Sequence, residues 1–166
     1  MECQFKGGVG KVRSLPPIGM RIIKSAIAVA ISAVFMEYVV RDTPFFACIG
    51  AVVSMERTME KSFEAALMRN LGTFIGGVFG MLVSFLTENV AIQALGVIPV
   101  IYIINLLKKH PSIIPGCIVF FAVVYLNDAN TGWIYGLRRI TETFMGSIIG
   151  LGVNNLIKSP REDMEI

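Results

Sequence analysis

A stretch of twelve residues in this chain recurs 70 residues later. Arg69–Gly80 (RNLGTFIGGVFG) and Arg139–Gly150 (RITETFMGSIIG) share one Arg, one Thr, one Phe and two Gly in register. Internal repeats in an apolar chain are typical of transporters, which bind substrate where the copies meet. The repeat therefore predicts two copies of one membrane unit, with the function located between them.

The composition places these copies in a lipid bilayer. Of the 166 residues, 54% are hydrophobic and only 16% are charged, whereas an average soluble domain has about 25% charged residues. The mean hydropathy is +0.68. We therefore expect an all-α membrane protein with six transmembrane helices, at Ile22–Val40, Pro44–Met55, Leu71–Leu86, Val90–Leu107, Ile113–Leu126 and Ile140–Ile157.

Six spans put both termini on one side, and the basic residues indicate that this side is the cytoplasm of a cell (inner) membrane protein. With that orientation twelve of the 15 Lys and Arg residues are cytoplasmic, and the other three are Arg41, Arg138 and Arg139. A rival topology lets the second and fifth spans re-enter without crossing. It would move Arg57, Lys61 and Arg69 outside and weaken the bias, so we favour six crossings.

Because each copy holds three spans, the second copy must be inverted relative to the first. The expected layout is a cytoplasmic segment 1–18, a membrane domain 19–158 and a short cytoplasmic tail 159–166, with repeats of about 19–88 and 89–158. The segment Glu56–Met68 has an apolar face at helical spacing and is expected to continue the second span. The second and fifth spans are short and begin near Pro44 and Pro111/Pro115, so they are expected to line a substrate path. Alternatively, flanking turns extend them to full length.

Glycines recur every four residues on one face of the third and sixth spans. Small residues at this spacing let helices pack closely in lipid. We expect helix packing more than substrate contact for this set: Gly72, Gly76, Gly80, Gly146 and Gly150.

Charged residues inside the apolar segments are the candidate substrate contacts. Glu142 stands where the first copy has Gly72, and Arg139 precedes it by one helical turn. A charge at membrane depth is costly and indicates function, and a guanidinium can bind a carboxylate with two hydrogen bonds. The alternative for Glu142 is a structural ion pair. The full set of candidates is Arg69, Arg139, Arg57, Glu142, Asn154 and Asn155.

Several other functions lack support. Lys24 and Glu37, near the ends of the first span, are expected to extend to the membrane interfaces. The cysteines Cys3, Cys48 and Cys117 form no metal or redox motif, and His110 is expected in a solvated basic loop. Neither a phosphate-binding loop nor a nucleophile motif occurs in the sequence, and the net charge of +3 is too small to suggest nucleic-acid binding. We expect no cofactor, no metal and no enzymatic activity.

Four segments together carry a family resemblance: Gly19–Val29, Pro44–Ala47, Arg69–Gly77 and Val153–Ile157. They resemble the bacterial aromatic acid exporter family of the fusaric-acid-resistance-like superfamily, over about Gly19 to Pro160. The resemblance implies a six-span inner-membrane efflux protein for aromatic carboxylic acids, with Arg69 and Arg139 as positions to test. Many members continue into a cytoplasmic helical domain, whereas this chain ends at Ile166, as a minimal or a truncated version.

The leading hypothesis is an exporter or channel for small organic anions. We expect a homodimer, because six short helices offer little material to enclose a path. The alternative is a structural or regulatory membrane subunit that binds a larger partner, with a soluble domain, through its glycine faces. An enzyme using Glu56, Glu60 or Glu142 is a third possibility.

Overall fold

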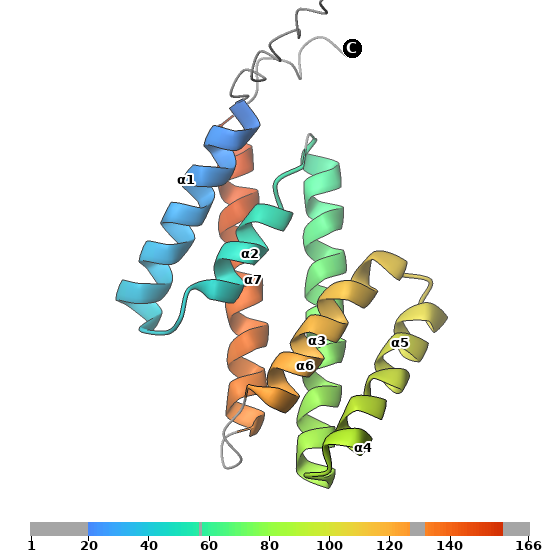
Figure 1. Ribbon diagram of the computed structural model, residues 1–166. Coiled ribbons are helices and arrows are strands. Elements are labelled where there is room, and N and C mark those ends of the chain that lie inside the picture. Colours follow the sequence, from blue (N-terminus) through green and yellow to red (C-terminus); the bar gives the residue numbers. More distant parts are fainter. Residues whose placement is uncertain (1–19, 57, 127–131, 158–166) are drawn as a thin grey trace, which may run out of the picture.

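The protein is all-α in a computed structural model that describes residues 20–56, 58–126 and 132–157 (Figure 1). No strand occurs within these ranges, in agreement with the predicted fold class. The elements in chain order are α1 (Met20–Phe35), the π-helix η1 (Met36–Val40), α2 (Phe45–Val53), α3 (Met59–Leu86), α4 (Val90–Leu95), α5 (Val97–Leu106), the 3-10 helix η2 (His110–Ser112), α6 (Ile113–Tyr125) and α7 (Gly132–Leu156).

The expected continuation of the second span through Glu56–Met68 is wrong, because the chain breaks between α2 and α3. Thr58 has an extended backbone, and its side chain accepts a hydrogen bond from the Lys61 backbone N–H at 3.3 Å. A threonine in this geometry caps a new helix. The amphipathic segment is therefore the first part of α3, which runs on through the predicted third span to Leu86.

Two long antiparallel helices, α3 and α7, form the middle of the molecule. Asn154 of α7 donates to Ser62 of α3 at 2.8 Å, and Ser147 of α7 donates to Asn70 of α3 at 3.2 Å. As the residue number rises along α3, the number of its partner on α7 falls. In Figure 1, α3 and α7 accordingly run side by side in opposite directions.

The two short helices pack reciprocally on these long ones. A Cβ on Gly146 of α7 would collide with the backbone of Ala47 in α2, and a Cβ on Gly76 of α3 would collide with the backbone of Gly116 in α6. Missing side chains thus allow backbone-to-backbone contact in both places. Each short helix therefore packs on the long helix of the other predicted repeat.

These short helices are much shorter than the thickness of a bilayer. α2 has 9 residues and α6 has 13, which at 1.5 Å per residue gives about 14 Å and 20 Å. The hydrocarbon core is about 30 Å thick. The predicted spans at Pro44–Met55 and Ile113–Leu126 therefore contain helices that do not reach across a bilayer by themselves.

The chain turns in the same way before each short helix. Arg41 follows η1 with φ of 57°, and Lys108 follows α5 closely with φ of 55°. These are the two described non-glycine residues with positive φ. A left-handed residue ends a helix and reverses the chain, so both predicted repeats use the same turn at equivalent places.

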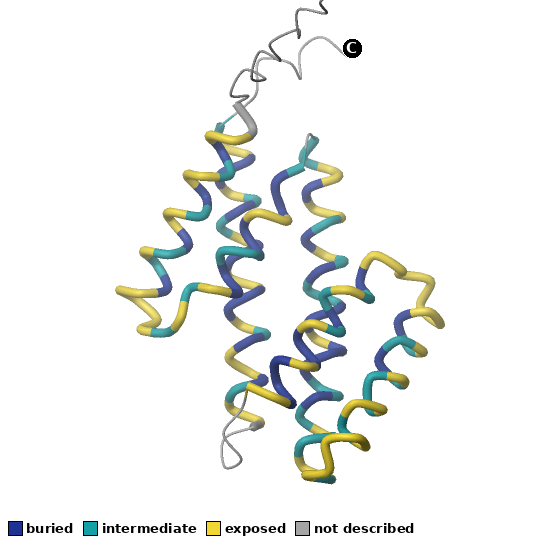
Figure 2. The backbone as a smooth tube through the Cα atoms, in the orientation of Figure 1, coloured by how far each residue is buried: buried dark blue, intermediate teal, exposed yellow. Residues whose placement is uncertain are grey.

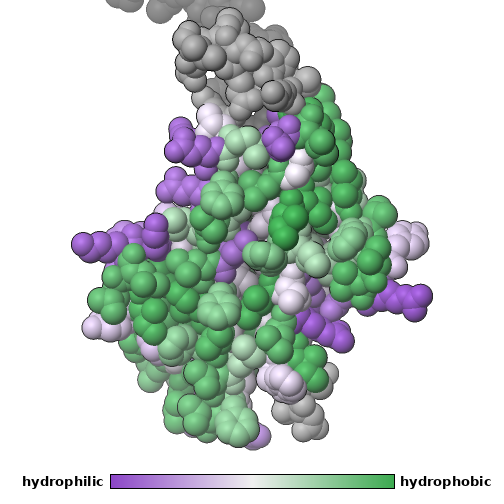
Figure 3. All heavy atoms as spheres, turned by 180° about the vertical axis from the view of Figure 1, so that it is seen from behind, coloured by the Kyte–Doolittle hydropathy of each residue, from purple (hydrophilic) through white to green (hydrophobic). Residues whose placement is uncertain are grey.

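The surface is strongly apolar, whereas burial is concentrated on the inner faces of α2, α3, α6 and α7 (Figure 2). Phe85 is 91% exposed and Leu86 is 77% exposed, and apolar side chains cover most of the face in Figure 3. Soluble proteins rarely expose such large apolar patches. Of the described helices, two are long and apolar enough to cross a membrane, Ile22–Val40 and Met59–Leu86. Val90–Leu106 and His110–Tyr125 are apolar but shorter.

Candidate functional site

A buried charge cluster joins α7 to the linker that precedes α2. Arg139 of α7 is 5% exposed and Glu142 is 2% exposed. The Arg139 Nη2 atom lies 2.8 Å from Glu142 Oε1 and 3.7 Å from Asp42 Oδ1. The alternative of a structural ion pair for Glu142 therefore matches the geometry at this end of α7.

Neutral groups complete the surroundings of Arg139. Thr43 Oγ1 lies 3.3 Å from Arg139 Nη1. The guanidinium carbon lies 5.0 Å from the ring centre of Phe46 and 4.6 Å from that of Tyr135, within the range of cation–π attraction. Arg139 is thus fixed by carboxylates, a hydroxyl and two rings.

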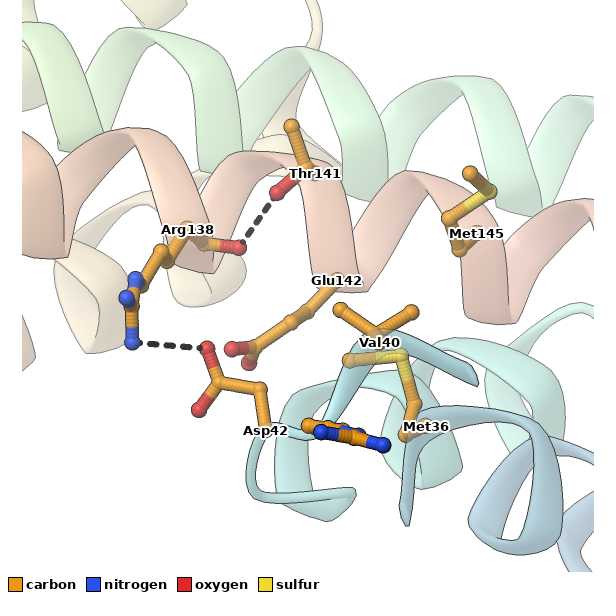
Figure 4. Close-up of a pocket in the computed structure, with 8 residues that line it drawn as sticks. Met36, Val40, Asp42, Arg138, Thr141, Glu142 and Met145 are labelled. Carbon is orange, nitrogen blue, oxygen red and sulfur yellow. Dashed lines mark hydrogen bonds and ion pairs between the residues drawn. The ribbon is translucent and has the colours of Figure 1, made fainter. Parts of the chain in front are cut away.

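The cluster borders a cavity of about 190 Å³ (Figure 4). Arg138 Nη1 forms an ion pair with Asp42 Oδ2 at 3.2 Å, and the carboxylates of Asp42 and Glu142 point toward one another. Neither Glu142 oxygen accepts a hydrogen bond from a described residue, since the close contact with Arg139 is not aligned for one. The cavity is lined by Met36, Val40, Arg41, Asp42, Arg138, Thr141, Glu142 and Met145.

The related arginine of the first copy, Arg69 in α3, has a different environment. It is 7% exposed, and no described carboxylate forms an ion pair with it. Its Nε atom is buried and has no hydrogen-bond acceptor in the described part of the chain. Gly72 stands where Glu142 stands in the second copy, and this difference explains why Arg69 lacks the partner that Arg139 has.

A polar cluster of neutral and basic side chains lies near the end of α7. Asn154 Nδ2 donates to Ser62 Oγ, and Lys24 Nζ donates to Asn154 Oδ1 at 3.5 Å. Lys24 is 6% exposed, so the expectation that it extends to an interface is wrong. The cause is the amide oxygen of Asn154, which gives the ammonium a partner inside the bundle.

The remaining predicted residues are dispersed. Asn155 and Glu37 are exposed, and Arg57 lies outside the described residues. Cys48 and Cys117 are free thiols, Cys3 lies outside the described residues, and exposed His110 lies 3.0 Å from the side chain of Asn105. A set of His, Cys, Asp or Glu side chains suited to a metal ion is absent from the described part.

Sequence reasoning missed four residues that surround Arg139: Asp42, Thr43, Phe46 and Tyr135. Tyr135 lies one helical turn before Arg139, so i, i+4 spacing could have identified it. The other three are more than 90 positions away in sequence, and no pattern in the chain points to them.

Comparison with known proteins places most of the chain in one family. The sequence profile described as aromatic acid exporter family member 1 matches residues 17–157. A UPF0421 protein of Oceanobacillus iheyensis is 32% identical over 148 residues, which cover 89% of this chain and 40% of the relative. A UPF0421 protein of Bacillus cereus is 29% identical over 153 residues, covering 92% of this chain and 42% of the relative.

The chain spans about two fifths of the length of these curated relatives. A UPF0421 protein of Bacillus thuringiensis shows the same coverage, at 28% identity. No solved structure matches the chain.

Proposed function

This chain belongs to the aromatic acid exporter family, and from that premise we propose that it is a multi-pass exporter or channel for small organic anions such as aromatic carboxylic acids. The family is one of exporters, which is not an enzyme class. The exporter family and the apolar helices together indicate a membrane protein. The substrate, the number of crossings and the mechanism are parts of the proposal.

The reciprocal packing of α2 on α7 and α6 on α3 carries the mechanistic part of the proposal. In that arrangement the two copies form inverted repeats, as the odd number of predicted spans requires. The buried arginines Arg69 and Arg139 then lie between the copies, where transporters of this construction bind substrate. A buried arginine that has no described carboxylate partner, Arg69, suits an anion with an aromatic body.

The depth of the two arginines supports a path through the bundle. Arg69 lies in the third turn of α3 and Arg139 in the second turn of α7. The pair of Ser147 with Asn70 sets the register of the long helices. With this register the two arginines are separated by roughly 13 Å along the bundle, at 1.5 Å per residue.

The proposal includes the orientation of the chain in the membrane, its oligomeric state and a partner. Both termini face the cytoplasm, and the protein works as a homodimer in the cell membrane. A soluble partner domain binds on the cytoplasmic side. The apolar exposed surface on α1, α3 and α5 supplies contact area for lipid and for a second copy.

Anion flux in liposomes tests the proposal. Purified protein is reconstituted, and efflux of radiolabelled benzoate is followed near neutral pH, where benzoate is charged. Protein-free liposomes measure diffusion, and liposomes loaded with benzamide measure leakage of a neutral aromatic of the same size. We expect benzoate efflux well above both controls.

Benzoate efflux no faster than in protein-free liposomes, from folded protein, would contradict the proposal. Co-purification of the chain with a larger membrane or soluble protein would then favour the alternative of a structural or regulatory subunit. Its glycine faces at Gly72–Gly80 and Gly146–Gly150 are buried within the bundle, so that partner would bind other surfaces.

A further inference from the structure

The two copies of the Arg-x-x-x-Thr element differ in their hydrogen bonds. In the second copy, Thr143 Oγ1 donates to the Arg139 carbonyl at 2.9 Å. In the first copy, Thr73 Oγ1 is buried and has no partner among the described residues, and the same holds for Arg69 Nε. Arg139 Nε also lacks an acceptor, but the Nη atoms of that guanidinium have three oxygen partners. The first copy therefore has two adjacent buried polar side chains, each with a polar atom that lacks a partner among the described residues.

The first copy lacks these partners because several residues differ between the two copies. Gly72 of the first copy stands at the position of Glu142 in the second. Ala65, four residues before Arg69, stands at the position of Tyr135, which lies four residues before Arg139. The linker before α6 contains Lys108, Lys109 and His110, and no carboxylate, whereas the linker before α2 contains Asp42. Both the counter-charge and the aromatic contact are thus lost around Arg69.

A buried guanidinium without a counter-charge is costly. The desolvation penalty for an ion inside a protein is several kcal/mol, and Arg cannot avoid it by losing its proton. A second buried cation, Lys24, also has no described carboxylate as an ion-pair partner. Lys24 lies near Ser62 through Asn154, and Ser62 precedes Arg69 by seven residues, on the same face of α3. Two buried cations therefore lie on this side of the bundle, where the backbone of Glu56 also bonds to Ser62 and Asn154.

We propose that Arg69 and Thr73 together bind the carboxylate of a small organic anion, whereas Arg139 forms an ion pair with Glu142 of its own helix. This inference rests on the proposed export function and assigns its anion site to the first copy. Residues four apart on a helix have Cβ atoms about 5–6 Å apart. One carboxylate can therefore accept from the guanidinium with one oxygen and from the hydroxyl with the other.

The test is equilibrium binding of radiolabelled benzoate to the full chain in nanodiscs. Arg69→Gln removes the charge, and we expect about tenfold or greater loss of affinity, as for a hydrogen bond to a charged group. Thr73→Val removes the hydroxyl without changing the shape, and we expect about threefold to tenfold loss, as for one neutral hydrogen bond. Benzamide, which has no carboxylate, should not compete.

Two control variants are matched to these changes. Thr143→Val makes the same substitution in the second copy, where the hydroxyl bonds only to its own helix, and should leave benzoate affinity unchanged. Lys109→Gln removes an exposed cation and should also leave it unchanged. Arg69→Lys keeps the charge and should retain part of the affinity if Arg69→Gln fails to fold.

Equal benzoate affinity in wild type, Thr73→Val and folded Arg69→Gln or Arg69→Lys would overturn the inference, while benzoate efflux from the wild type would still support export. If the wild type neither binds nor transports benzoate, both proposals fail. Loss of affinity in Thr143→Val equal to that in Thr73→Val would also overturn the assignment to the first copy.

Discussion

Arg139 and Glu142 form a 2.8 Å ion pair one turn apart on α7, and both side chains are almost fully buried. Asp42, from the linker before α2, approaches the same guanidinium at 3.7 Å. The pair therefore does more than stabilise one helix, because it also fixes the position of the linker. The equivalent arginine of the first copy, Arg69, has no ion pair with a described carboxylate at either corresponding place.

The effects of removing Arg139 and Glu142 should be unequal. Arg139→Gln leaves the buried Glu142 without its cation, while Asp42 keeps Arg138, and breaking a buried pair in this way costs about 3–5 kcal/mol. Glu142→Gln should cost less, because Arg139 keeps Asp42, Thr43 and both rings. The measurement is the free energy of unfolding in detergent.

The double variant Arg139→Gln/Glu142→Gln supplies the control. It has no unpaired charge at these two positions, so its loss of stability should be smaller than the sum of the single losses. Strict additivity would contradict the ion pair.

The close helix contacts predict opposite effects for three glycines. A Cβ at Gly76 would meet the backbone of Gly116, and a Cβ at Gly146 would meet the backbone of Ala47. Each Gly→Ala variant should destabilise the fold by about 1–3 kcal/mol or more, as overpacking does. Gly152 has nothing within 4 Å of its Cβ position, so Gly152→Ala should stabilise α7 by about 0.5–1 kcal/mol.

Thermal unfolding of the three alanine variants checks this prediction. A lower midpoint for Gly76→Ala and Gly146→Ala and a higher one for Gly152→Ala are expected. If all three variants change the unfolding midpoint of the wild type by a similar amount, the short helices do not contact the long ones through these glycines.

The adjacent asparagines Asn154 and Asn155 form a matched pair. Asn154 bonds to Ser62 and Lys24, whereas Asn155 is exposed. Asn154→Ala leaves the Lys24 ammonium without its amide partner and should cost about 1–3 kcal/mol. Asn155→Ala should change stability by about 0.5 kcal/mol or less. Equal losses in a denaturation experiment would contradict the buried network.

The features that the sequence predicts here are periodic and local. The glycine spacing in α3 and in α7 follows from residues within one helix, and the repeat follows from direct comparison of two stretches of the sequence. The all-α class follows from the apolar runs. Thr58 stands directly before Met59, the first residue of the apolar face, which is the usual place of a helix cap. The spacing of that face alone does not show where the preceding helix ends.

The contacts of the charge cluster with residues outside α7 could not be predicted in the same way. Asp42 and Arg138 are 96 positions apart, and their contact depends on how α2 packs on α7. Lys24 shows the same limit, because its place near one end of an apolar run predicts an interface residue. Only the packed structure brings Asn154 within reach of it, 130 positions away in sequence.

The left-handed turn before α6 gives a prediction for one exposed residue. Lys108 has φ of 55°, and its N–H donates to the Asn105 carbonyl at 2.9 Å. A side chain makes this conformation unfavourable by about 1–2 kcal/mol, and glycine adopts it without that cost. Lys108→Gly should therefore raise the free energy of unfolding by about 0.5–1 kcal/mol, once the greater chain entropy of glycine in the unfolded state is included.

The neighbouring Lys109 is the control for this change. Its φ is −109°, which other residues adopt freely, so Lys109→Gly should lower stability by about 0.5–1 kcal/mol through the same unfolded-state entropy. Both side chains are exposed and both carry one positive charge, so loss of charge cannot explain a difference in sign. If chemical denaturation shows that both glycine variants lose stability equally, Lys108 does not adopt the left-handed turn in solution.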